Sequence, residues 1–416
     1  MKYDLRSSVV CVIGLGYVGL PLAEALSQKL KVIGFDTDEQ KINQLSQHKS
    51  NVLAFTTDPK QISKADFIII TVPTPVTKSK EPDLSYVIDA ARKVSQTMKK
   101  GCTVILESTV YPGATEDVVK PVLEEAGLKC GDDFKLAYSP ERINPGDKEH
   151  TIDKTTKIVA GADEETTEII AELYRLITPN IFPVRNIRTA EAAKVIENVQ
   201  RDLNIALMNE LAIIFEKMGL DTREILDAAG TKWNFHRYSP GLVGGHCIPV
   251  DPYYLVYKAK ELDYHPQVIL AGRAINDYMP KHVAEMTIKA LNNVSKVIKG
   301  SKVLIMGLTY KENVADPRET PAKEIIKELQ QYGVEVLGYD PRLTNIEEEF
   351  EIKAVLDFKE SPKVDCIIVA VAHDAFREIK LDKIRSIMND KPILVDVRGL
   401  FSQSEATRKG FYYTSL

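Results

Sequence analysis

A short glycine-rich segment near the start of the chain places the strongest constraint on its fold. The run Ser8-Val9-Val10-Cys11-Val12-Ile13 predicts a buried parallel strand, and it leads directly into Gly14-Leu15-Gly16-Tyr17-Val18-Gly19. Glycines at this spacing allow a tight turn, close approach of the backbone to a pyrophosphate, and close packing of the next helix. Because the three-glycine pattern alone is weak evidence, its meaning depends on the residues that follow.

Those residues complete a dinucleotide-binding unit. Residues 20–30 predict a helix, residues 31–35 predict a second strand, and Asp36 follows that strand, about 20 residues after Gly14. A carboxylate at this place accepts hydrogen bonds from the adenosine ribose and would repel a 2′-phosphate, so NAD is favoured over NADP. The alternative interpretation of Asp36 is a helix cap.

Strands and helices continue to alternate through the first part of the chain. Further strands are predicted at 66–72, 103–109, 134–138, 156–161 and 180–185, and helices at 84–98 and 164–177. Polar residues follow the strands, among them Thr74, Thr109 and Ser139-Pro140-Glu141-Arg142. Because ligands of doubly wound sheets bind beyond the carboxyl ends of the strands, we expect these residues to face a cofactor. A surface charge is the alternative interpretation of Glu141.

The middle of the chain is predicted to be mostly helical. Residues 189–218 contain neither Gly nor Pro and keep apolar residues at helical spacing, which predicts one unusually long helix. Lys194 and Asn198 lie four residues apart on one face of it, although a solvated face would look the same. A second helical stretch at 266–297 contains Arg273.

The last part of the chain returns to strand signals, at 301–307, 334–339, 364–371 and 392–397. Its first turn, Gly307-Leu308-Thr309-Tyr310-Lys311, lacks the three-glycine spacing, which argues against a second dinucleotide bound in the same manner. Lys311, Arg318 and Arg398 follow predicted strands and are interpreted either as phosphate ligands or as loop charges.

The predicted fold class is therefore α/β, with two doubly wound Rossmann-like domains joined by a helical middle segment that contains one long central helix. We predict domain boundaries at 1–188, 189–298 and 299–416. The long helix is expected to expose more apolar surface than one chain covers, which predicts a homodimer or a higher homo-oligomer.

The segment 239–254 carries the most reactive side chain. Glycines and prolines bracket single Cys, His and Asp residues at Cys247, His246 and Asp251, which predicts a rigid loop that holds polar groups. A thiol is the natural nucleophile among them, because it is partly ionised near neutral pH and can trap a carbonyl group. The alternative is a cysteine that serves only in packing.

Composition excludes several classes. The net charge of −5 and a pI near 5.9 argue against a nucleic-acid partner. Five scattered cysteines with no CxxC pair suit a reducing cytoplasm better than disulfides, and they indicate no structural zinc or other metal site. No run of about 18 apolar residues or signal peptide is recognisable, so no membrane partner is predicted.

Several of these segments together resemble the UDP-glucose/GDP-mannose dehydrogenase family of NAD-dependent nucleotide-sugar 6-dehydrogenases. The resemblance extends from Gly14 to Arg398. It rests on the following segments: Gly14-Leu15-Gly16-Tyr17-Val18-Gly19, Glu107-Ser108-Thr109, Ser139-Pro140-Glu141-Arg142, Glu191-Ala192-Ala193-Lys194 with Asn198, Gly244-Gly245-His246-Cys247 with Asp251, and Tyr339-Asp340-Pro341.

The resemblance implies a four-electron oxidation of C6 of a UDP-sugar with two NAD molecules in succession. An aldehyde has no hydride to lose until a nucleophile adds, so Cys247 would form a thiohemiacetal and then a thioester. Further roles are implied by resemblance alone. Lys194 and Asn198 would steady an oxyanion, Asp251 or a water would take protons, and Glu141 and Thr109 would assist hydrolysis; how Glu141, Lys194 and Asp251 divide the proton transfers stays open.

The resemblance also implies a cofactor site and a substrate site. The cofactor would contact the glycine turn including Tyr17 and Val18, Asp36, Thr74 and Thr109. The remaining expected substrate contacts are Glu141, Arg142, Lys194, Asn198, Gly244, His246, Lys311, Arg318, Arg398 and, donated by a partner subunit, Arg273.

The form of the cysteine loop narrows the expected substrate. His246 directly before Cys247, with Ile-Pro-Val-Asp-Pro-Tyr-Tyr after it, resembles the branch that acts on UDP-N-acetylhexosamines more than the UDP-glucose branch. The galactosamine, glucosamine and mannosamine epimers all stay open. Such enzymes supply uronic acids for surface polysaccharides.

UDP-glucose 6-dehydrogenase is one alternative. A two-electron dehydrogenase of the β-hydroxyacid type is another, since it shares the first domain and the long helix but needs no catalytic cysteine. A non-catalytic NAD-sensing protein would keep residues 14–36 and tolerate the loss of Cys247.

Overall fold

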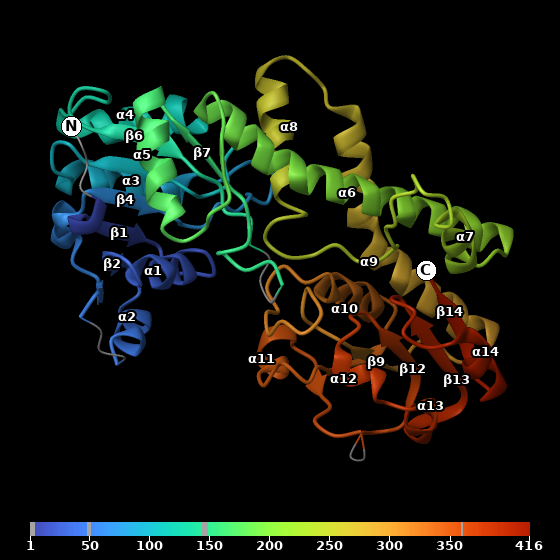
Figure 1. Ribbon diagram of the computed structural model, residues 1–416. Helices are drawn as coiled ribbons and strands as arrows, with labels where there is room; N and C mark the ends of the chain where they lie inside the picture. Colours follow the sequence, from blue (N-terminus) through green and yellow to red (C-terminus); the bar gives the residue numbers. More distant parts are fainter. Residues whose placement is uncertain (1–4, 48–50, 144–148, 359–360) are drawn as a thin grey trace. The chain divides into compact units, whose positions relative to one another are not determined.

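Figure 1 shows the computed structural model of the chain, which describes residues 5–47, 51–143, 149–358 and 361–416. The chain forms two compact units. The first unit comprises Met1–Asn198 and Val250–His265, and the second comprises Val199–Pro249 and Pro266–Leu416. Helix α6 (Ile187–Met218) crosses the boundary in sequence. The long helix expected at 189–218 is thus confirmed, whereas the three domain boundaries stay a prediction.

The first unit is built on an eight-stranded sheet with the order β3-β2-β1-β4-β5-β6-β7-β8. This is the strand order of a doubly wound fold, extended at one edge by two strands. The strands are β1 (Val9–Ile13), β2 (Lys31–Phe35), β3 (Leu53–Thr56), β4 (Phe67–Ile70), β5 (Thr103–Leu106), β6 (Lys135–Tyr138), β7 (Lys157–Gly161) and β8 (Ile181–Pro183).

Helices cover both faces of this sheet (Figure 1). Alternate residues of β1 point to opposite faces, so Cys11 and Ile13 join one hydrophobic cluster while Val10 and Val12 join the other. The helices of the unit are α1 (Gly19–Ser27), α2 (Glu39–Leu45), α3 (Ser85–Thr97), α4 (Lys120–Leu123), α5 (Glu164–Arg175) and α8 (Asp251–Glu261), with short turns η1 (Leu5–Ser7), η2 (Pro59–Lys64), η3 (Thr115–Val119) and η4 (Glu124–Ala126).

Strand β7 departs from the parallel pattern. It pairs antiparallel with β6, with Ala137 opposite Gly161 and Tyr138 opposite Ala160. A parallel pairing needs a crossover connection, usually a helix, and the described residues between β6 and β7 form no helix. The first residues of β7 therefore lie at the end of the sheet where β5 and β6 end.

The second unit contains a six-stranded parallel sheet with the order β11-β10-β9-β12-β13-β14. The two doubly wound sheets expected from the sequence are thus both present. The strands are β9 (Lys302–Met306), β10 (Glu335–Tyr339), β11 (Lys353–Ala354), β12 (Val364–Val369), β13 (Met388–Asp396) and β14 (Tyr412–Ser415).

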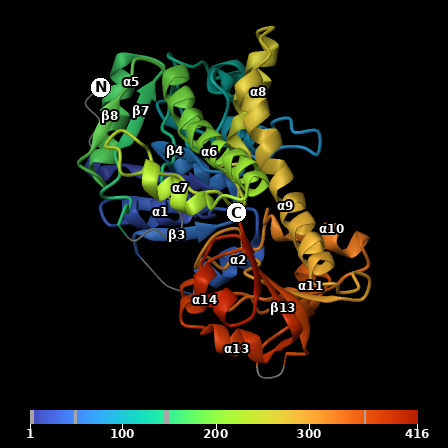
Figure 2. The ribbon, with the colours of Figure 1, turned by 90° about the vertical axis from the view of Figure 1, so that its right-hand side faces the viewer.

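Helices α9 and α10 cover one face of this second sheet, where Val303 and Ile305 of β9 are buried. Leu304 and Met306 point to the other face, where Phe376 of α12 joins the same cluster. Helices α13 and α14 pack beside β13 and β14 (Figures 1 and 2). The helices of the unit besides its part of α6 are α7 (Thr222–Ala229), α9 (Gln267–Asn293), α10 (Ala322–Gln331), α11 (Ile346–Phe350), α12 (Asp374–Arg377), α13 (Leu381–Ser386) and α14 (Gln403–Arg408).

The loop expected at 239–254 is shorter than predicted. Helix α8 begins at Asp251, with Pro252 in its first turn. Proline is well suited to that position, because its fixed φ fits the first turn and its missing N–H is not needed there. Asp251 is therefore held by a helix, and only the residues before it form a loop.

Candidate active site

The glycine turn between β1 and α1 is fixed by backbone hydrogen bonds. Gly14 has φ +90°, a conformation that favours glycine, and its N–H donates to the Phe35 carbonyl oxygen at 2.9 Å. The Thr71 hydroxyl lies 2.9 Å from the Ile13 carbonyl oxygen and 2.7 Å from that of Gly14. Thr71 was not among the expected residues, although it follows β4 directly.

The three glycines have different reasons to lack a side chain. A Cβ at Gly19 would lie 1.9 Å from the Gly14 carbonyl oxygen, so Gly19 is needed for packing of α1 against the turn. A Cβ at Gly16 would meet no atom within 4 Å among the described residues. Val18, at the N-cap of α1, makes no side-chain capping hydrogen bond, and Tyr17 is 58% exposed. This open, uncapped helix N-terminus fits a dinucleotide pyrophosphate.

Asp36 is buried beside the same turn. Its carboxylate accepts the Leu15 N–H at 2.9 Å and the Asp38 N–H at 3.0 Å, and the Lys41 ammonium lies 2.9 Å away. Burial alone would raise the pKa of Asp36, but these partners hold it below its ordinary value. The helix-cap interpretation is wrong, because Asp38 caps α2 through the Lys41 N–H. Lys41 was missed, since a lysine on a helix carries no signal of its own.

Thr74 and Thr109 lie at the ends of neighbouring strands, as expected. Thr109 is half-buried after β5, and the Ser108 hydroxyl donates to the Val72 carbonyl oxygen at 2.7 Å, which ties the two strand ends together. Thr74 lies by the Tyr254 hydroxyl, which donates to the Pro75 carbonyl oxygen at 3.1 Å. Tyr254 of α8 thus braces this edge of the sheet.

A buried polar group joins α6 to the start of α8 within the first unit. Asn198 donates to Asp251 Oδ2 at 2.6 Å, and Lys194 lies on the same helix face one turn earlier. All three residues are buried, so the solvated-face interpretation is wrong. Burial raises the pKa of Asp251 to about 6, against the opposing effects of the Lys194 charge and the Asn198 hydrogen bond. A carboxyl group that titrates near neutral pH is suited to proton transfer.

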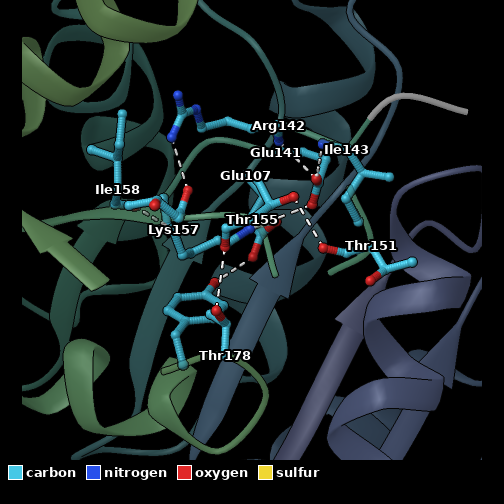
Figure 3. A network of polar contacts seen from close by, with 12 residues as sticks. Glu107, Glu141, Arg142, Ile143, Thr151, Thr155, Lys157, Ile158 and Thr178 are labelled. Atoms are coloured by element: carbon cyan, nitrogen blue, oxygen red, sulfur yellow. Dashed lines mark hydrogen bonds and ion pairs between the residues drawn. The ribbon is translucent and has the colours of Figure 1, made fainter. Parts of the chain in front are cut away.

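Glu141 belongs to a second buried group, shown in Figure 3. Lys157 Nζ lies 2.7 Å from Glu107 Oε2 and 3.4 Å from Glu141 Oε2. The other oxygen of Glu141 accepts the N–H groups of Arg142 and Ile143. The surface-charge interpretation of Glu141 is therefore wrong. Lys157 was missed because the reversal of β7 is not visible in the sequence.

Arg142 points away from this group and is fixed by other partners. Its guanidinium donates to the Thr156 carbonyl oxygen at 2.9 Å and pairs with Glu197 of α6 at 2.8 Å. Both partners belong to the first unit, so Arg142 links the strand end to the long helix. The geometry gives it a structural role beside its predicted substrate contact.

In the second unit, the loop that carries Cys247 packs closely against residues 310–321. A Cβ at Gly244 would lie 2.5 Å from Pro321, and one at Gly245, whose φ is +88°, would lie 2.6 Å from the Tyr310 ring. The Gly245 N–H donates to the Glu319 carbonyl oxygen at 3.0 Å. These glycines therefore fix the loop, as predicted, by letting it approach its neighbours.

Cys247 is the only exposed cysteine of the five, all of which lie in the described ranges. Burial raises the pKa of both Cys11 and Cys102 to about 12, so these thiols are poor nucleophiles. The ring of His246 meets that of Tyr310 edge to face at 5.9 Å. Partial burial, with the Arg318 charge acting in the same direction, lowers the pKa of His246. Cys247 is thus accessible beside an imidazole that is neutral at physiological pH.

Two of the expected phosphate ligands line one hollow in the second unit. Lys311 and Arg398 both line it, together with Leu242, Thr309, Glu312 and Pro321. The Arg398 guanidinium pairs with Glu312 at 2.8 Å, and both side chains are about one third exposed, at 33% and 32%. The loop-charge interpretation does not explain why the two cations share one hollow, so a role in phosphate binding is favoured.

Arg318 and Arg273 have carboxylate partners of their own. Arg318 holds Asp316 in a two-point contact, at 2.9 Å for each hydrogen bond. Arg273 is 2% exposed, with its guanidinium 2.6 Å from Asp202 and also in contact with Asp277. A side chain buried in its own unit is poorly placed to reach the substrate of a partner subunit. The geometry therefore gives Arg273 a structural role, and its contact with a partner subunit's substrate stays a prediction.

An open glycine turn with Asp36 behind it, in a doubly wound sheet with polar strand ends, is the arrangement of an NAD-binding domain of the dehydrogenase type. Three family domains match consecutive parts of the chain. The NAD binding domain of the UDP-glucose/GDP-mannose dehydrogenase family matches residues 8–53 and 45–178, its central domain matches 188–278, and its UDP binding domain matches 304–403. The chain belongs to this family, and it is a NAD-dependent nucleotide-sugar dehydrogenase.

Individual relatives are similar over nearly their whole length. The chain is 47% identical to "Protein CapL" of Staphylococcus aureus, with 95% of this chain and 97% of that protein covered. It is 45% identical to a UDP-N-acetyl-D-glucosamine 6-dehydrogenase of Pseudomonas aeruginosa, with 97% and 99% covered. Among solved structures, a UDP-D-ManNAc dehydrogenase from Pyrococcus horikoshii matches with a TM-score of 0.88 and 31% identity, over 98% of each chain.

No helix in the described ranges is both long and apolar enough to cross a membrane.

Proposed function

We propose that the chain oxidises C6 of a UDP-N-acetylhexosamine to the corresponding uronic acid, with two NAD molecules in succession and with Cys247 as the covalent nucleophile. The exposure of Cys247 in a closely packed loop is the observation that carries the proposal. Its neighbour His246 and the similarity to UDP-N-acetylhexosamine dehydrogenases support the substrate class.

The thiol matters in the second half of the reaction. After the first oxidation, Cys247 Sγ adds to the aldehyde carbon, which gives a thiohemiacetal with a hydride on that carbon. Loss of this hydride leaves a thioester, and water then releases the acid and restores the thiol. NAD, when bound, accepts the hydride in each oxidation.

The buried polar group of the first unit is assigned to the charges that develop on the substrate. The Lys194 ammonium and the Asn198 amide stabilise the oxyanion that forms when the aldehyde is attacked. Asp251, with its pKa raised to about 6, takes and returns protons. Glu141 takes a proton from the attacking water during hydrolysis, and Thr109 orients that water.

Lys311 and Arg398 are assigned to the diphosphate of the UDP-sugar, because both line the hollow in the second unit. Binding of the diphosphate would replace Glu312 as the partner of Arg398. Arg398→Ala is expected to weaken UDP binding by about 1–3 kcal/mol and to leave NAD binding unchanged, as titration calorimetry would report.

The decisive experiment compares wild-type protein with Cys247→Ala. The loop is fixed by glycines and prolines, so loss of the thiol should leave both nucleotide affinities nearly normal, while acid formation falls by about 10³-fold or more. Wild-type rates of acid release by the variant would exclude the covalent mechanism. Cys130→Ala, at a half-buried cysteine, is the matched control.

A panel of UDP-sugars tests the substrate class. We expect NADH formation with at least one of UDP-N-acetylglucosamine, UDP-N-acetylgalactosamine and UDP-N-acetylmannosamine, and weaker activity with UDP-glucose. Two NADH per product distinguish this reaction from a two-electron dehydrogenase. Turnover of UDP-glucose with none of the three N-acetylated sugars would overturn the proposal in favour of UDP-glucose 6-dehydrogenase.

The proposal includes a homodimer in the cytoplasm that supplies uronic acids for surface polysaccharides. Leu207, Ile214 and Met218 are large, exposed and aligned on one side of α6, since they are seven and four residues apart in turn. An apolar stripe of this kind suits an interface with a second copy. A monomeric mass in light scattering at micromolar concentration would refute the dimer.

A further inference from the structure

The group around Lys157 has more negative than positive charge. It consists of two carboxylates, Glu107 and Glu141, which share the Lys157 ammonium, and all three residues are buried (Figure 3). Buried charges are costly unless they are paired, so a buried group with one excess negative charge calls for a functional explanation.

The sheet topology brings Lys157 to this place. β7 runs antiparallel to β6, with Tyr138 opposite Ala160, so Lys157 at the start of β7 comes beside the residues that follow β6, where it contacts Glu141. β5 lies beside β6 in parallel, so Glu107 after β5 meets the same point. Three polar residues from distant parts of the sequence thus converge at one strand edge.

The two carboxylates are held differently. Glu107 is 1% exposed and accepts from Lys157 on one oxygen and from the Tyr174 hydroxyl on the other, a pattern of two donors that fits the ionised form. Lys157 also lies over the Tyr174 ring, 4.9 Å from its centre. Glu107 and Lys157 therefore form a fixed ion pair, and Glu141 is its more exposed neighbour, at 8%.

The other ionisable neighbours of Glu141 have partners of their own. Arg142 pairs with Glu197, and Tyr174 donates to Glu107. Burial raises the pKa of Glu107, and the two carboxylates raise that of Lys157 although burial alone would lower it, so the ammonium is retained. Among the residues described here, Lys157 is the charged side chain in contact with the Glu141 carboxylate.

We propose that Lys157 is a positioning residue that holds Glu141 as an oriented anion for hydrolysis of the Cys247 thioester, and that Glu107 tunes this effect by sharing the ammonium. Lys157 has this role only if Glu141 acts in hydrolysis, as the proposed function states. In that step the water oxygen bonds to the carbonyl carbon, the C–S bond breaks, and Glu141 takes the water proton and returns it to sulfur.

Charge bookkeeping explains why the ammonium is shared. When Glu141 takes the proton, the group becomes neutral, because Glu107 and Lys157 remain as an ion pair. An ammonium that interacted with Glu141 alone would stabilise the Glu141 anion and make it a weaker base. Without any ammonium, the two carboxylates would repel each other, which favours a bound proton. An ammonium shared with Glu107 gives the Glu141 carboxylate a basicity between these two limits.

The test uses full-length variants, the UDP-N-acetylhexosamine that wild-type protein oxidises best, stopped-flow NADH detection and intact-protein mass spectrometry. In Lys157→Met the two oxidations should proceed and hydrolysis should be slow. We expect a burst of two NADH per subunit, a thioester adduct on the protein, and a steady-state kcat reduced about 100-fold. The acid limb of the kcat profile should move to higher pH by about one unit.

Opposite pH shifts separate positioning from a structural role. In Glu107→Gln the Lys157 ammonium interacts with Glu141 alone, so the acid limb of the kcat profile should move to lower pH. Lys157→Arg keeps the positive charge, so kcat should stay within about threefold of wild type and no adduct should form. Lys135→Met is the matched control. Lys135 also begins a strand of this sheet, but its partner is the exposed Glu165, and wild-type kinetics are expected.

Each outcome of these experiments either supports the role of Lys157 or overturns a stated part of the proposal. If Lys157→Met does not fold, the double variant Glu107→Gln/Lys157→Met restores the net charge that this group has in wild type and is expected to give the same burst and adduct. A folded variant with wild-type kcat, or acid limbs that move in the same direction in the Glu107 and Lys157 variants, would overturn the role of Lys157. Glu141→Gln is the reference: absence of an adduct there would instead count against the proposed hydrolysis step itself.

Discussion

Each of the two sheets begins with a strand and a glycine turn, but the acidic residue beside the turn has different partners in the two units. In the first unit Gly14 has φ +90° and Asp36 accepts the Leu15 N–H, and in the second Gly307 has φ +88° and Asp340 accepts the Leu308 N–H. The correspondence extends to the strand order around β1 and β9. The two turns are therefore equivalent parts of one fold.

The difference lies in what surrounds the acidic residue. Asp36 has a flexible, 38% exposed Lys41 as its charged partner, and the space at Gly16 is open. Asp340 instead meets His373, which is fully buried at 3.1 Å, and also accepts the N–H groups of Thr309 and Arg342. The acidic residue of the first turn has an exposed charged partner that a ligand can replace, whereas the acidic residue of the second turn is held by buried groups of its own chain.

The largest effect should come from opening the second turn. His373→Ala removes a buried ring, leaves Asp340 with one donor fewer, and removes the acceptor of the Asn313 N–H, so we expect about 3 kcal/mol lower stability in urea unfolding. The exposed His265→Ala is the control. A variant with wild-type stability would show that His373 does not hold the second turn in place.

Removing the acidic residue of the first turn should affect binding more than stability. Asp36→Ala is expected to weaken NAD binding by about 1–3 kcal/mol, through lost hydrogen bonds to the ribose. The ratio of kcat/KM for NAD to that for NADP should fall, because the negative charge that opposes a 2′-phosphate is gone. Equal or better kcat/KM with NADP in the wild-type protein would refute the assignment of Asp36.

A smaller change at the open space should sharpen the contrast. Gly16→Ala adds a methyl group that meets no described atom within 4 Å, so the melting temperature should stay within error of wild type. NAD affinity should fall about tenfold, because the methyl group occupies space that a pyrophosphate needs. Unchanged affinity would mean that the cofactor does not approach the turn at Gly16.

The contrast between the turns explains what the sequence can predict. The glycine spacing and Asp36 identify the first turn because all their determinants lie within one strand-turn-strand segment. The closure of the second turn depends on His373, which is distant in sequence from Asp340, so only the missing glycines could be noticed. Lys41 was missed for another reason, since its partner is close but helical lysines are common.

The same reasoning applies to the candidate site. Cys247, Asn198 and Asp251 carry recognisable residue types within short segments, and their burial or exposure agrees with the expected chemistry. Lys157 could not be found, because its position depends on the reversed direction of β7. Arg273 was assigned from the family resemblance, which does not reveal that Asp202 already holds it.

A buried carboxyl group from each unit extends the comparison to the pH dependence of stability. Glu191 accepts two backbone N–H groups, from Gly113 and Thr115, but burial dominates and raises its pKa to about 7. For Asp340, burial acts in the same direction, yet His373 and the backbone donors hold its pKa below the ordinary value. Glu191 and Asp340 should therefore contribute to the pH dependence of stability with opposite sign.

Glu191→Gln should isolate the contribution of Glu191 to the pH dependence of stability. Because the folded pKa of Glu191 is raised, its stabilising contribution is complete below the unfolded value of 4.5 and is lost as pH rises through about 7. Glutamine keeps one acceptor and cannot ionise, so the variant should lose about 2 kcal/mol less stability than wild type between pH 5 and pH 8. Parallel urea-unfolding profiles for the two proteins over this range would show that Glu191 does not titrate in the folded state. The carboxylate of Glu191 would then be as well satisfied by its own chain as that of Asp340, and the contrast would be confined to the two turns.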